Sequence, residues 1–310
     1  MNKMKAVVIN DYNELMELKE VSQPKLLDDS VLIEVHGASV NPVDGIVQAG
    51  YLKDFMPISF PYVMGYDVSG VVVQVGKDVT KFKAGDEVFS RPNGLQAGTL
   101  AEFCVVKEEE LAIKPSNISH PQAATIPLVG LTALQALTSK GGLKQGEKVL
   151  IHAGSGGVGT LAIQIAKHLG AEVATTTSTT NVDLVKSLGA DVVIDYKTQN
   201  FEDELNDYDL VIDMMGGEAL DKSFQVLKKG GRLISIKGQD TNGLAEKYGV
   251  HFDWFFMWPS GEQLTELAQM ITDGKLKPVV DKTFTLDDFN SAYEHLATGR
   301  TKGKIAIAVK

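Results

Sequence analysis

The first third of the chain carries short apolar runs that predict β-strands. These runs are rich in Val, Ile and Phe, and Gly, Asp and Pro residues bound them, which is the composition expected of strands and turns. They span residues 31–35, 68–76, 85–89 and 100–106. Several such runs at close spacing predict a barrel or sandwich rather than strands that alternate with helices.

The pattern changes near residue 120, where residues 121–140 contain few turn residues and predict a largely helical segment. Beyond this segment, apolar strands alternate with helices. The strands are expected at 148–153, 172–176, 191–195, 209–213 and 232–236, and the helices at 158–169 and 182–188. This order predicts βαβ units, and therefore an α/β domain with a parallel sheet that is covered on both faces.

The tail of the chain has a mixed pattern. Residues 263–271 place their apolar side chains on one helical face, residues 287–296 predict a second short helix, and residues 304–309 predict a closing strand. We expect this strand to rejoin the β-rich region, which makes that domain discontinuous. The predicted domains are 1–122 with 275–310 for the β-rich domain and 123–274 for the parallel-sheet domain.

The composition is typical of a soluble globular protein. A length of 310 residues corresponds to about two domains, and 44% hydrophobic and 23% charged residues exclude wholesale disorder. No apolar stretch reaches the length that spans a bilayer, and the apolar run at 6–9 is too short for the core of a signal peptide. We therefore expect a cytoplasmic protein with no membrane partner.

Charge and cysteine content exclude further classes. The net charge of −10 argues against a broad nucleic-acid surface, although one local basic pocket for a phosphorylated cofactor remains compatible with it. The single cysteine, Cys104, excludes an intramolecular disulfide and any zinc cluster built from several cysteines. Because Cys104 lies within a predicted strand, we expect a buried structural thiol.

The most informative segment is a glycine loop between a predicted strand and a predicted helix. Gly154, Gly156 and Gly159 form the pattern G-x-G-x-x-G. In this context the first glycine permits a tight turn, the second lets the backbone approach a pyrophosphate, and the third lets helix and strand pack closely. A plain strand-to-helix turn is the alternative. The residues expected to bind the cofactor here are Gly154, Ser155, Gly156, Gly157, Val158 and Gly159.

The end of the second predicted strand indicates which dinucleotide binds. An NAD site usually has an acidic residue there, whereas this chain has only Thr, Ser and Asn at 175–181. Glu172 is at the strand's entrance and Asp183 is in the next helix, so the absence of an acid favours NADPH. A simple polar loop is the alternative. Lys186 and Lys304 are candidate cations for the 2′-phosphate. The further cofactor-binding residues are Thr177, Ser178, Asn181, Tyr196 and Lys304.

Four other motifs extend this reading over nearly the whole chain. They are Asn-Pro-Val-Asp at 41–44, a Val-rich run ending in Gly at 71–76, Ala-Gly-Asp-Glu-Val at 84–88 and an Ala-Ala-x-x-Pro-x-x-Gly-x-Thr-Ala block at 123–133. Together with the glycine loop they resemble the medium-chain dehydrogenase/reductase superfamily, and specifically its zinc-free quinone oxidoreductase branch. The resemblance implies a Rossmann doubly wound parallel sheet inserted into a GroES-like β-rich domain. It also implies a homodimer.

The chain departs from the zinc alcohol dehydrogenases that it resembles. Those enzymes carry a Cys ligand in the segment corresponding to 41–44 and Gly-His-Glu where this chain has Gly65-Tyr66-Asp67. Neither the Cys nor the His is present, so we expect no metal site. Without a Lewis acid, the acceptor must be electrophilic by itself, as a quinone or an α,β-unsaturated carbonyl is. Such an acceptor needs mainly orientation over the nicotinamide and a proton.

The catalytic candidates follow from the resemblance. Asn41 would hold the nicotinamide or the substrate by its amide, and Thr132 would face the nicotinamide. Tyr51 and Tyr66 would line the pocket as candidate proton donors, with solvent as a competitor. The alternatives are a turn residue before Pro42, a threonine bonded to its own helix, and amphipathic packing of the tyrosines.

These observations predict an NADPH-dependent, zinc-independent oxidoreductase that transfers hydride to a small apolar carbonyl or quinone substrate. A non-catalytic NADPH-binding structural or sensor protein of the same fold is the alternative, because no indispensable catalytic acid is evident. The aromatic stretch 252–258 could wall a substrate pocket, pack a subunit interface or fill the core.

Overall fold

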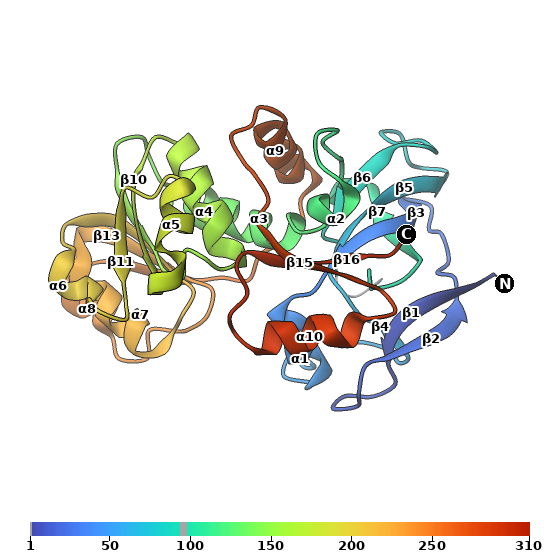
Figure 1. Ribbon diagram of the computed structural model, residues 1–310, viewed down its shortest axis with the longest axis horizontal. Coiled ribbons are helices and arrows are strands. Elements are labelled where there is room, and N and C mark those ends of the chain that lie inside the picture. The colour runs from blue at the N-terminus through green and yellow to red at the C-terminus, as the bar shows by residue number, and fades with distance from the viewer. Residues whose placement is uncertain (1, 94–97) are drawn as a thin grey trace. The chain divides into compact units, whose positions relative to one another are not determined.

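The computed structural model describes residues 2–93 and 98–310, which form two compact units (Figure 1). Unit 1 consists of Met1–Leu131, Trp258–Gly274 and Pro278–Lys310, and unit 2 consists of Thr132–Met257 and Lys275–Lys277. Each unit has its own sheet and its own apolar core, so each is described by itself.

Unit 1 is built on a seven-stranded sheet in the order β15-β16-β3-β5-β6-β8, with β7 paired to β3. All pairings are antiparallel except that of β15 with β16. The strands are β3 (Ser30–Ser39), β5 (Asp67–Val75), β6 (Glu87–Ser90), β7 (Phe103–Lys107), β8 (Leu111–Ile113), β15 (Val280–Thr285) and β16 (Lys304–Ala308). A smaller sheet contains β2 (Glu17–Ser22), β1 (Lys3–Ile9) and β4 (Tyr62–Val63).

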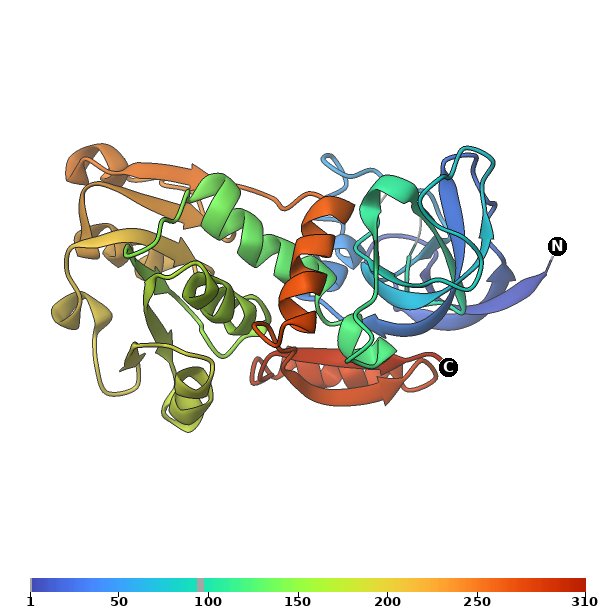
Figure 2. The same ribbon diagram turned by 90° about the horizontal axis from the view of Figure 1, so that it is seen from above.

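The C-terminal strand β16 lies between β15 and β3 (Figure 1), and the red C-terminal segment can also be followed in the second ribbon view (Figure 2). Its register pairs Ala306 with Ser39 and Ala308 with Gly37. The prediction that the tail strand rejoins the β-rich region is therefore confirmed. Residues from near both ends of the chain are thereby held side by side in one sheet.

The core of unit 1 follows from the apolar strand pattern. Val31, Ile33 and Val35 alternate along β3 and are fully buried against Val72 of β5. Cys104 of β7 is buried in the same cluster, and burial raises the pKa of its thiol to about 12. The prediction of a buried structural thiol is confirmed.

Four α-helices accompany the sheets of unit 1: α1 (Pro42–Gln48), α2 (His120–Ala123), α9 (Gly261–Thr272) and α10 (Phe289–Ala297). Helix α9 packs on β8, and a Cβ atom on Gly261 would lie 2.5 Å from the Leu111 carbonyl oxygen. The Asn117 amide also donates to the Ile271 carbonyl oxygen at 2.9 Å. These contacts hold α9 in unit 1, whereas the sequence reading groups residues up to 274 with the parallel-sheet domain.

Unit 2 contains a six-stranded, wholly parallel sheet in the order β11-β10-β9-β12-β13-β14. Numbered within this unit, that order is 3-2-1-4-5-6, which defines the Rossmann fold. The strands are β9 (Lys148–Ile151), β10 (Glu172–Thr177), β11 (Val192–Asp195), β12 (Tyr208–Asp213), β13 (Leu227–Ser235) and β14 (His251–Trp254). The predicted fold class, a Rossmann parallel sheet with a GroES-like β-rich domain, is confirmed.

Helices link the strands of this sheet. They are α4 (Gly157–His168), α5 (Val182–Ser187), α6 (Phe201–Glu204), α7 (Gly217–Ser223) and α8 (Leu244–Tyr248), whereas α3 (Pro127–Leu134), with a π-helical continuation over Gln135–Lys140, precedes β9. The buried apolar cluster includes Leu150, Val211 and Leu233 from three adjacent strands. In the part of the chain that the structure describes, we find no helix with the length and apolarity of a membrane span.

Candidate active site

The glycine loop connects β9 to α4 in unit 2. Its backbone turns at Ala153, which has a positive φ of 50°. The Gly154 N–H donates to the Thr176 carbonyl oxygen at 3.0 Å, and the Gly156 N–H donates to the Ala153 carbonyl oxygen at 2.9 Å. These bonds fix the loop against the carboxyl end of β10, the neighbouring strand.

The three glycines of the motif serve different purposes. A Cβ atom on Gly154 would overlap the Thr175 side chain, and one on Gly159 would lie 2.7 Å from the Gly154 Cα atom. Both glycines are therefore required by the protein's own packing. A Cβ atom on Gly156 would meet only the Ala153 carbonyl oxygen, at 3.3 Å. The space beside Gly156 is thus left open, which is what the backbone approach of a pyrophosphate requires.

The N-terminus of α4 offers donors to that space. Gly156 is the N-cap, and the first bond inside the helix runs from the Thr160 N–H to the Gly156 carbonyl oxygen at 3.0 Å. The N–H groups of the preceding residues have no acceptor within the helix. Together with the helix dipole, they form an environment suited to phosphate oxygens. The residues present therefore fit a dinucleotide.

A polar cluster lies beside the loop and unites four of the predicted cofactor residues. Ser155 Oγ accepts hydrogen bonds from Thr177 Oγ1 at 3.0 Å and from Asn181 Nδ2 at 3.1 Å. Asn181 Nδ2 also donates to Ser178 Oγ at 3.2 Å. Asn181 Oδ1 is buried and has no hydrogen-bond partner among the residues that the structure describes. An orphaned buried acceptor next to a phosphate loop suits a ligand hydroxyl group.

Tyr196 joins this cluster from the end of β11. Its N–H donates to the Thr177 carbonyl oxygen at 3.1 Å, and its side chain is 56% exposed. The Lys197 ammonium lies 5.2 Å from the centre of the Tyr196 ring. Sequence reasoning missed Lys197, although its position directly after Tyr196 was a usable signal. The adjacent Asp195 accepts from Thr179 Oγ1 at 2.6 Å, and this hydrogen bond lowers the pKa of its carboxyl.

In unit 1, Asn41 caps α1 and is held by three buried partners. Its Nδ2 donates to Asp67 Oδ2 at 2.8 Å, and its Oδ1 accepts from Lys304 Nζ at 2.5 Å. Its backbone N–H donates to Asp44 Oδ2 at 2.7 Å. The Asn41 side chain is therefore part of a defined polar network and not only a turn residue before Pro42.

Asp67 and Lys304 form the charged part of this network, and both are buried. Besides Asn41, Asp67 accepts from Ser39 Oγ at 2.6 Å and from the Leu128 N–H at 2.7 Å. Lys304 Nζ lies 3.6 Å from Asp67 Oδ2 and donates to the Val40 carbonyl oxygen at 2.9 Å. Burial lowers the pKa of Lys304, and the charge of Asp67 opposes that change.

The structure places Lys304 in the Asn41 network. The sequence reading assigns it to the cofactor as a candidate cation for a 2′-phosphate. In the structure its ammonium is buried inside unit 1 and committed to Val40, Asn41 and Asp67. Lys304 therefore belongs to the Asn41 network, and its assignment to a 2′-phosphate stays a prediction.

Asp44 is a further member of the network that sequence reasoning did not assign, although it completes the Asn-Pro-Val-Asp motif. Its Oδ2 accepts from Tyr293 Oη at 2.8 Å, whereas its Oδ1 is buried and has no partner within the described ranges 2–93 and 98–310. Burial is the main reason that the pKa of Asp44 rises to about 7. The network thus contains a carboxyl group that changes charge near neutral pH.

The two candidate tyrosines lie in contrasting environments. Tyr66 is fully buried, receives a hydrogen bond from Tyr62 Oη at 3.4 Å and lies under the Arg91 guanidinium, 5.4 Å from its ring centre. Burial raises the pKa of Tyr66 far above its usual range. In this structure the Tyr66 hydroxyl is enclosed and harder to ionise, and its role as a proton donor stays a prediction. Tyr51 is 82% exposed, and Thr132 is buried in α3.

Residues 2–93 and 98–310 contain no group of three or more His, Cys, Asp or Glu side chains placed to hold a metal ion. The segments that correspond to zinc ligands in the resembling dehydrogenases are occupied differently here. Asn41 and Asp67 bind the Lys304 ammonium, and Tyr66 packs in the core. This donor set does not fit zinc.

Three families of known proteins match parts of the chain. Residues 27–116 match the alcohol dehydrogenase GroES-like domain, and residues 188–307 match the zinc-binding dehydrogenase family. Residues 132–215 match the C-terminal domain of alanine dehydrogenase and PNT. The matches cover both the β-rich unit and the parallel-sheet unit.

Whole-length relatives agree with these matches. The chain is 39% identical to 2-methylene-furan-3-one reductase of Solanum lycopersicum, over 99% of this chain and 79% of that protein. It is 39% identical to the chloroplastic NADPH-dependent alkenal/one oxidoreductase of Arabidopsis thaliana, over 98% and 79%. The structure of the quinone oxidoreductase from Coxiella burnetii superposes with a TM-score of 0.91 at 33% identity, with both chains covered completely.

The chain therefore belongs to the medium-chain dehydrogenase/reductase family, as a member of the quinone oxidoreductase type. It is an oxidoreductase of the enone- and quinone-reductase kind that uses a nicotinamide cofactor. The family resemblance seen in the sequence motifs is confirmed.

Proposed function

We propose that the protein is an NADPH-dependent, zinc-independent reductase that transfers hydride to a quinone or an α,β-unsaturated carbonyl. One observation carries the proposal: Gly156 leaves open space in front of the α4 N-terminus, between two glycines that the fold itself requires. Open space beside a helix N-terminus is the geometry that a phosphate-binding loop requires. A bound nicotinamide cofactor supplies the hydride.

The preference for NADPH is supported by the end of β10. The strand ends at Thr177, and hydroxyl and amide side chains follow it where an NAD enzyme would place an acid. The exposed Lys197 beside Tyr196 provides positive charge near the same strand ends. We assign the 2′-phosphate to this region, with Ser178 as a hydroxyl donor and Lys197 as the cation.

The acceptor class is supported by chemistry and by the relatives' names. Residues in the Asn41 network do not fit zinc, so an acceptor that is electrophilic without a metal is favoured. Two relatives at 39% identity are named for reducing a furanone and alkenals or alkenones. Hydride adds to the electrophilic carbon, and the reduced product gains one proton. Asn41 would orient the acceptor or the nicotinamide by its amide, and solvent or exposed Tyr51 would deliver the proton.

The test is a cofactor-oxidation assay with purified protein. NADPH or NADH is mixed with a panel of small quinones and enones, and absorbance of the reduced cofactor is followed. We expect acceptor-dependent oxidation, with a larger kcat/KM for NADPH than for NADH. NADPH binding without oxidation by any acceptor would support the non-catalytic alternative, and no NADPH binding would overturn the proposal.

We also propose a homodimer formed through β14. This strand is at the end of the six-stranded sheet, where it pairs with β13. Large aromatic side chains that are 36–41% exposed lie in and directly after it: Trp254, Phe256 and Trp258. An edge strand with exposed aromatic residues is suited to pairing with a second copy. Light scattering that gives a mass near twice 33.5 kDa would support this assembly, and a monomer would exclude it.

A further inference from the structure

The cation at the centre of the Asn41 network is a side chain of the protein, the Lys304 ammonium. We propose that the Lys304 ammonium acts as an internal cation in place of a metal ion, and that it is the positioning residue for the Asn41 amide. The inference rests on the proposed function, because it gives Asn41 its role toward the acceptor or nicotinamide.

The geometry leaves the Asn41 amide one orientation. Lys304 Nζ donates to Asn41 Oδ1 at 2.5 Å, and Asn41 Nδ2 donates to Asp67 Oδ2 at 2.8 Å. Turning the amide over would set its NH₂ group against an ammonium and its carbonyl against a carboxylate. Both contacts would then be repulsive, so the pair of opposite charges selects a single amide orientation.

The Lys304 ammonium is itself fixed. It donates to the Val40 carbonyl oxygen at 2.9 Å, and it lies 3.6 Å from Asp67 Oδ2. Asp67 is held in turn by Ser39 Oγ and by the Leu128 N–H. The two partners of the amide, Lys304 and Asp67, are thus each anchored by a backbone group or a short hydrogen bond. Such a network is rigid because each member's position is set by another.

The charge balance explains why a cation is needed at this position. Two buried carboxyl groups, Asp44 and Asp67, lie in the network with one ammonium. An isolated buried carboxylate is strongly unfavourable, whereas a buried carboxylate with a cation and several donors is tolerated. In the resembling zinc enzymes the corresponding segments hold a metal ion, and here Lys304 contacts them instead. The Lys304 ammonium therefore stands where those enzymes hold zinc, which explains why the residues present do not fit zinc.

The ammonium also changes the chemistry of the amide. A cation on the carbonyl oxygen polarises the amide group and strengthens its N–H groups as donors. One Nδ2 proton is used by Asp67, and the second has no acceptor among the described residues. That proton is the one available to an acceptor carbonyl oxygen. Lys304 would thus act on the reaction through Asn41, without contacting the reacting atoms.

The test is a double-mutant cycle with Lys304→Met and Asn41→Ala. If Lys304 acts through Asn41, Lys304→Met lowers kcat with a quinone or enone about 10- to 100-fold, the range for losing a charged hydrogen bond. The same substitution in the Asn41→Ala background then has little further effect. The Kd for NADPH stays within about twofold of the wild-type value, because the glycine loop is untouched. Additive effects, or an unchanged kcat, would contradict the proposal.

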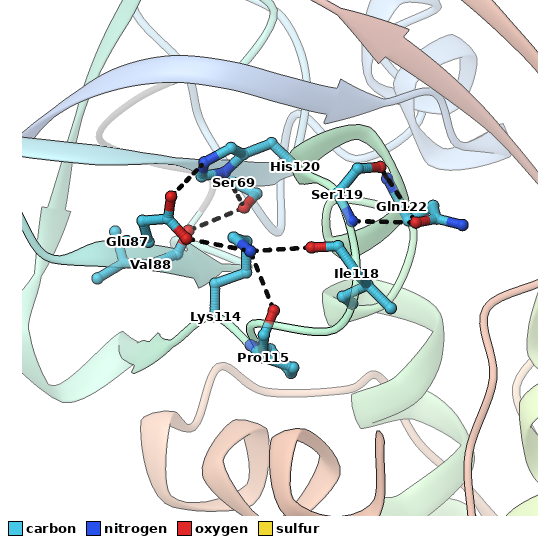
Figure 3. Close-up of polar contacts among 9 residues, drawn as sticks. All are labelled: Ser69, Glu87, Val88, Lys114, Pro115, Ile118, Ser119, His120 and Gln122. Carbon is cyan, nitrogen blue, oxygen red and sulfur yellow. Dashed lines mark hydrogen bonds and ion pairs between the residues drawn. The ribbon is translucent and has the colours of Figure 1, made fainter. Parts of the chain in front are cut away.

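A second buried lysine provides a matched control. Lys114 donates to the carbonyl oxygens of Pro115 and Ile118 at 3.0 and 2.9 Å and pairs with Glu87 at 3.2 Å (Figure 3). Lys114→Met removes a buried ammonium from the same unit without altering the Asn41 network. We expect it to lower the melting temperature and leave kcat unchanged. An equal loss of kcat in both variants would mean that Lys304 has a structural role only.

Two further measurements test the inference if Lys304→Met does not fold or if no acceptor is turned over. Lys304→Met with Asp67→Asn removes both charges together, so it avoids an uncompensated carboxylate if the single variant does not fold. A crystal structure of either variant shows whether the Asn41 amide has rotated. An amide that keeps its wild-type position overturns the proposal even if no acceptor is ever turned over. Absence of turnover by the wild type would instead overturn the proposed function.

Discussion

Gly159 and Ala153 approach each other so closely that a Cβ atom on Gly159 would overlap the Ala153 carbonyl oxygen. This contact joins the first turn of α4 to the loop that follows β9. Gly156, three residues earlier, has only one neighbouring atom within 4 Å of its would-be Cβ, at 3.3 Å. The fold therefore requires Gly159, and we propose that a bound pyrophosphate requires Gly156.

We expect Gly156→Val to abolish cofactor binding while the protein stays folded. The side chain would extend into the space that the pyrophosphate occupies, so NADPH affinity should fall at least about 100-fold. Isothermal titration calorimetry and thermal melting measure the two effects. Gly159→Val is the matched control and should lower the melting temperature by several degrees, since its side chain collides with backbone. Unchanged NADPH affinity in Gly156→Val would show that the pyrophosphate does not bind beside Gly156.

Ser178→Asp should shift the preference from NADPH toward NADH. A carboxylate at this position would repel a 2′-phosphate and could accept from ribose hydroxyl groups. We expect the ratio of the two dissociation constants to change by about tenfold or more. Ser187→Asp, which places the same charge at an exposed position on α5, is the control and should leave the ratio alone. If both variants keep the wild-type ratio, Ser178 is not at the phosphate site.

Asp44 should make the protein less stable as the pH rises. Its pKa is 3.8 when unperturbed and about 7 in the folded state, where Tyr293, Asp67 and Lys304 surround it. The folded protein thus holds this proton more tightly than the unfolded chain does. The resulting stabilisation is complete below about pH 4 and is lost as the pH rises through 7, an effect on the order of 4 kcal/mol.

Denaturant unfolding of wild type and Asp44→Asn between pH 4 and pH 8 tests this assignment. The free energy of unfolding of Asp44→Asn, relative to the wild type, should increase across that range. Any fixed penalty from the new amide is independent of pH and does not affect the slope. Parallel curves for the two proteins would show that folding does not raise the pKa of Asp44.

Cys104 should be unreactive in the native protein. Its thiol is buried and its pKa is raised to about 12, so almost no thiolate exists near pH 8. We expect no reaction with a thiol-specific disulfide reagent over an hour, and reaction of one thiol per chain after denaturation. Rapid modification of the folded protein would mean that β7 opens readily.

The local sequence pattern predicted much of unit 2, because each strand and the helix after it lie next to each other in one short stretch of sequence. The glycine loop and the polar end of β10 could both be predicted from such local stretches. In the structure, Ser155 and Asn181 form a hydrogen bond beside the loop. The strand β14 was not predicted, since its aromatic residues show neither a two-residue nor a helical period. Its role as an edge strand depends on pairing with β13, which only the fold reveals.

The Asn41 network could not be read from the sequence, because its members are up to 263 residues apart. The register of β16 against β3 brings them together. Ala306 lies opposite Ser39, and the Val40 N–H reaches the Ile305 carbonyl oxygen. Continuing that antiparallel register by one pair places Lys304 beside Asn41. Sequence reasoning anticipated the return of the tail strand but not its register, and so did not connect Lys304 with Asn41.

The position of β16 has a consequence for how the protein is made. During translation, unit 2 is synthesised almost entirely as one stretch and can fold as it leaves the ribosome. The edge of β3 that receives β16 must wait until residues 304–308 emerge, and until then Asp67 lacks its counter-ion. The nascent chain therefore carries an unfinished β-domain through most of its synthesis.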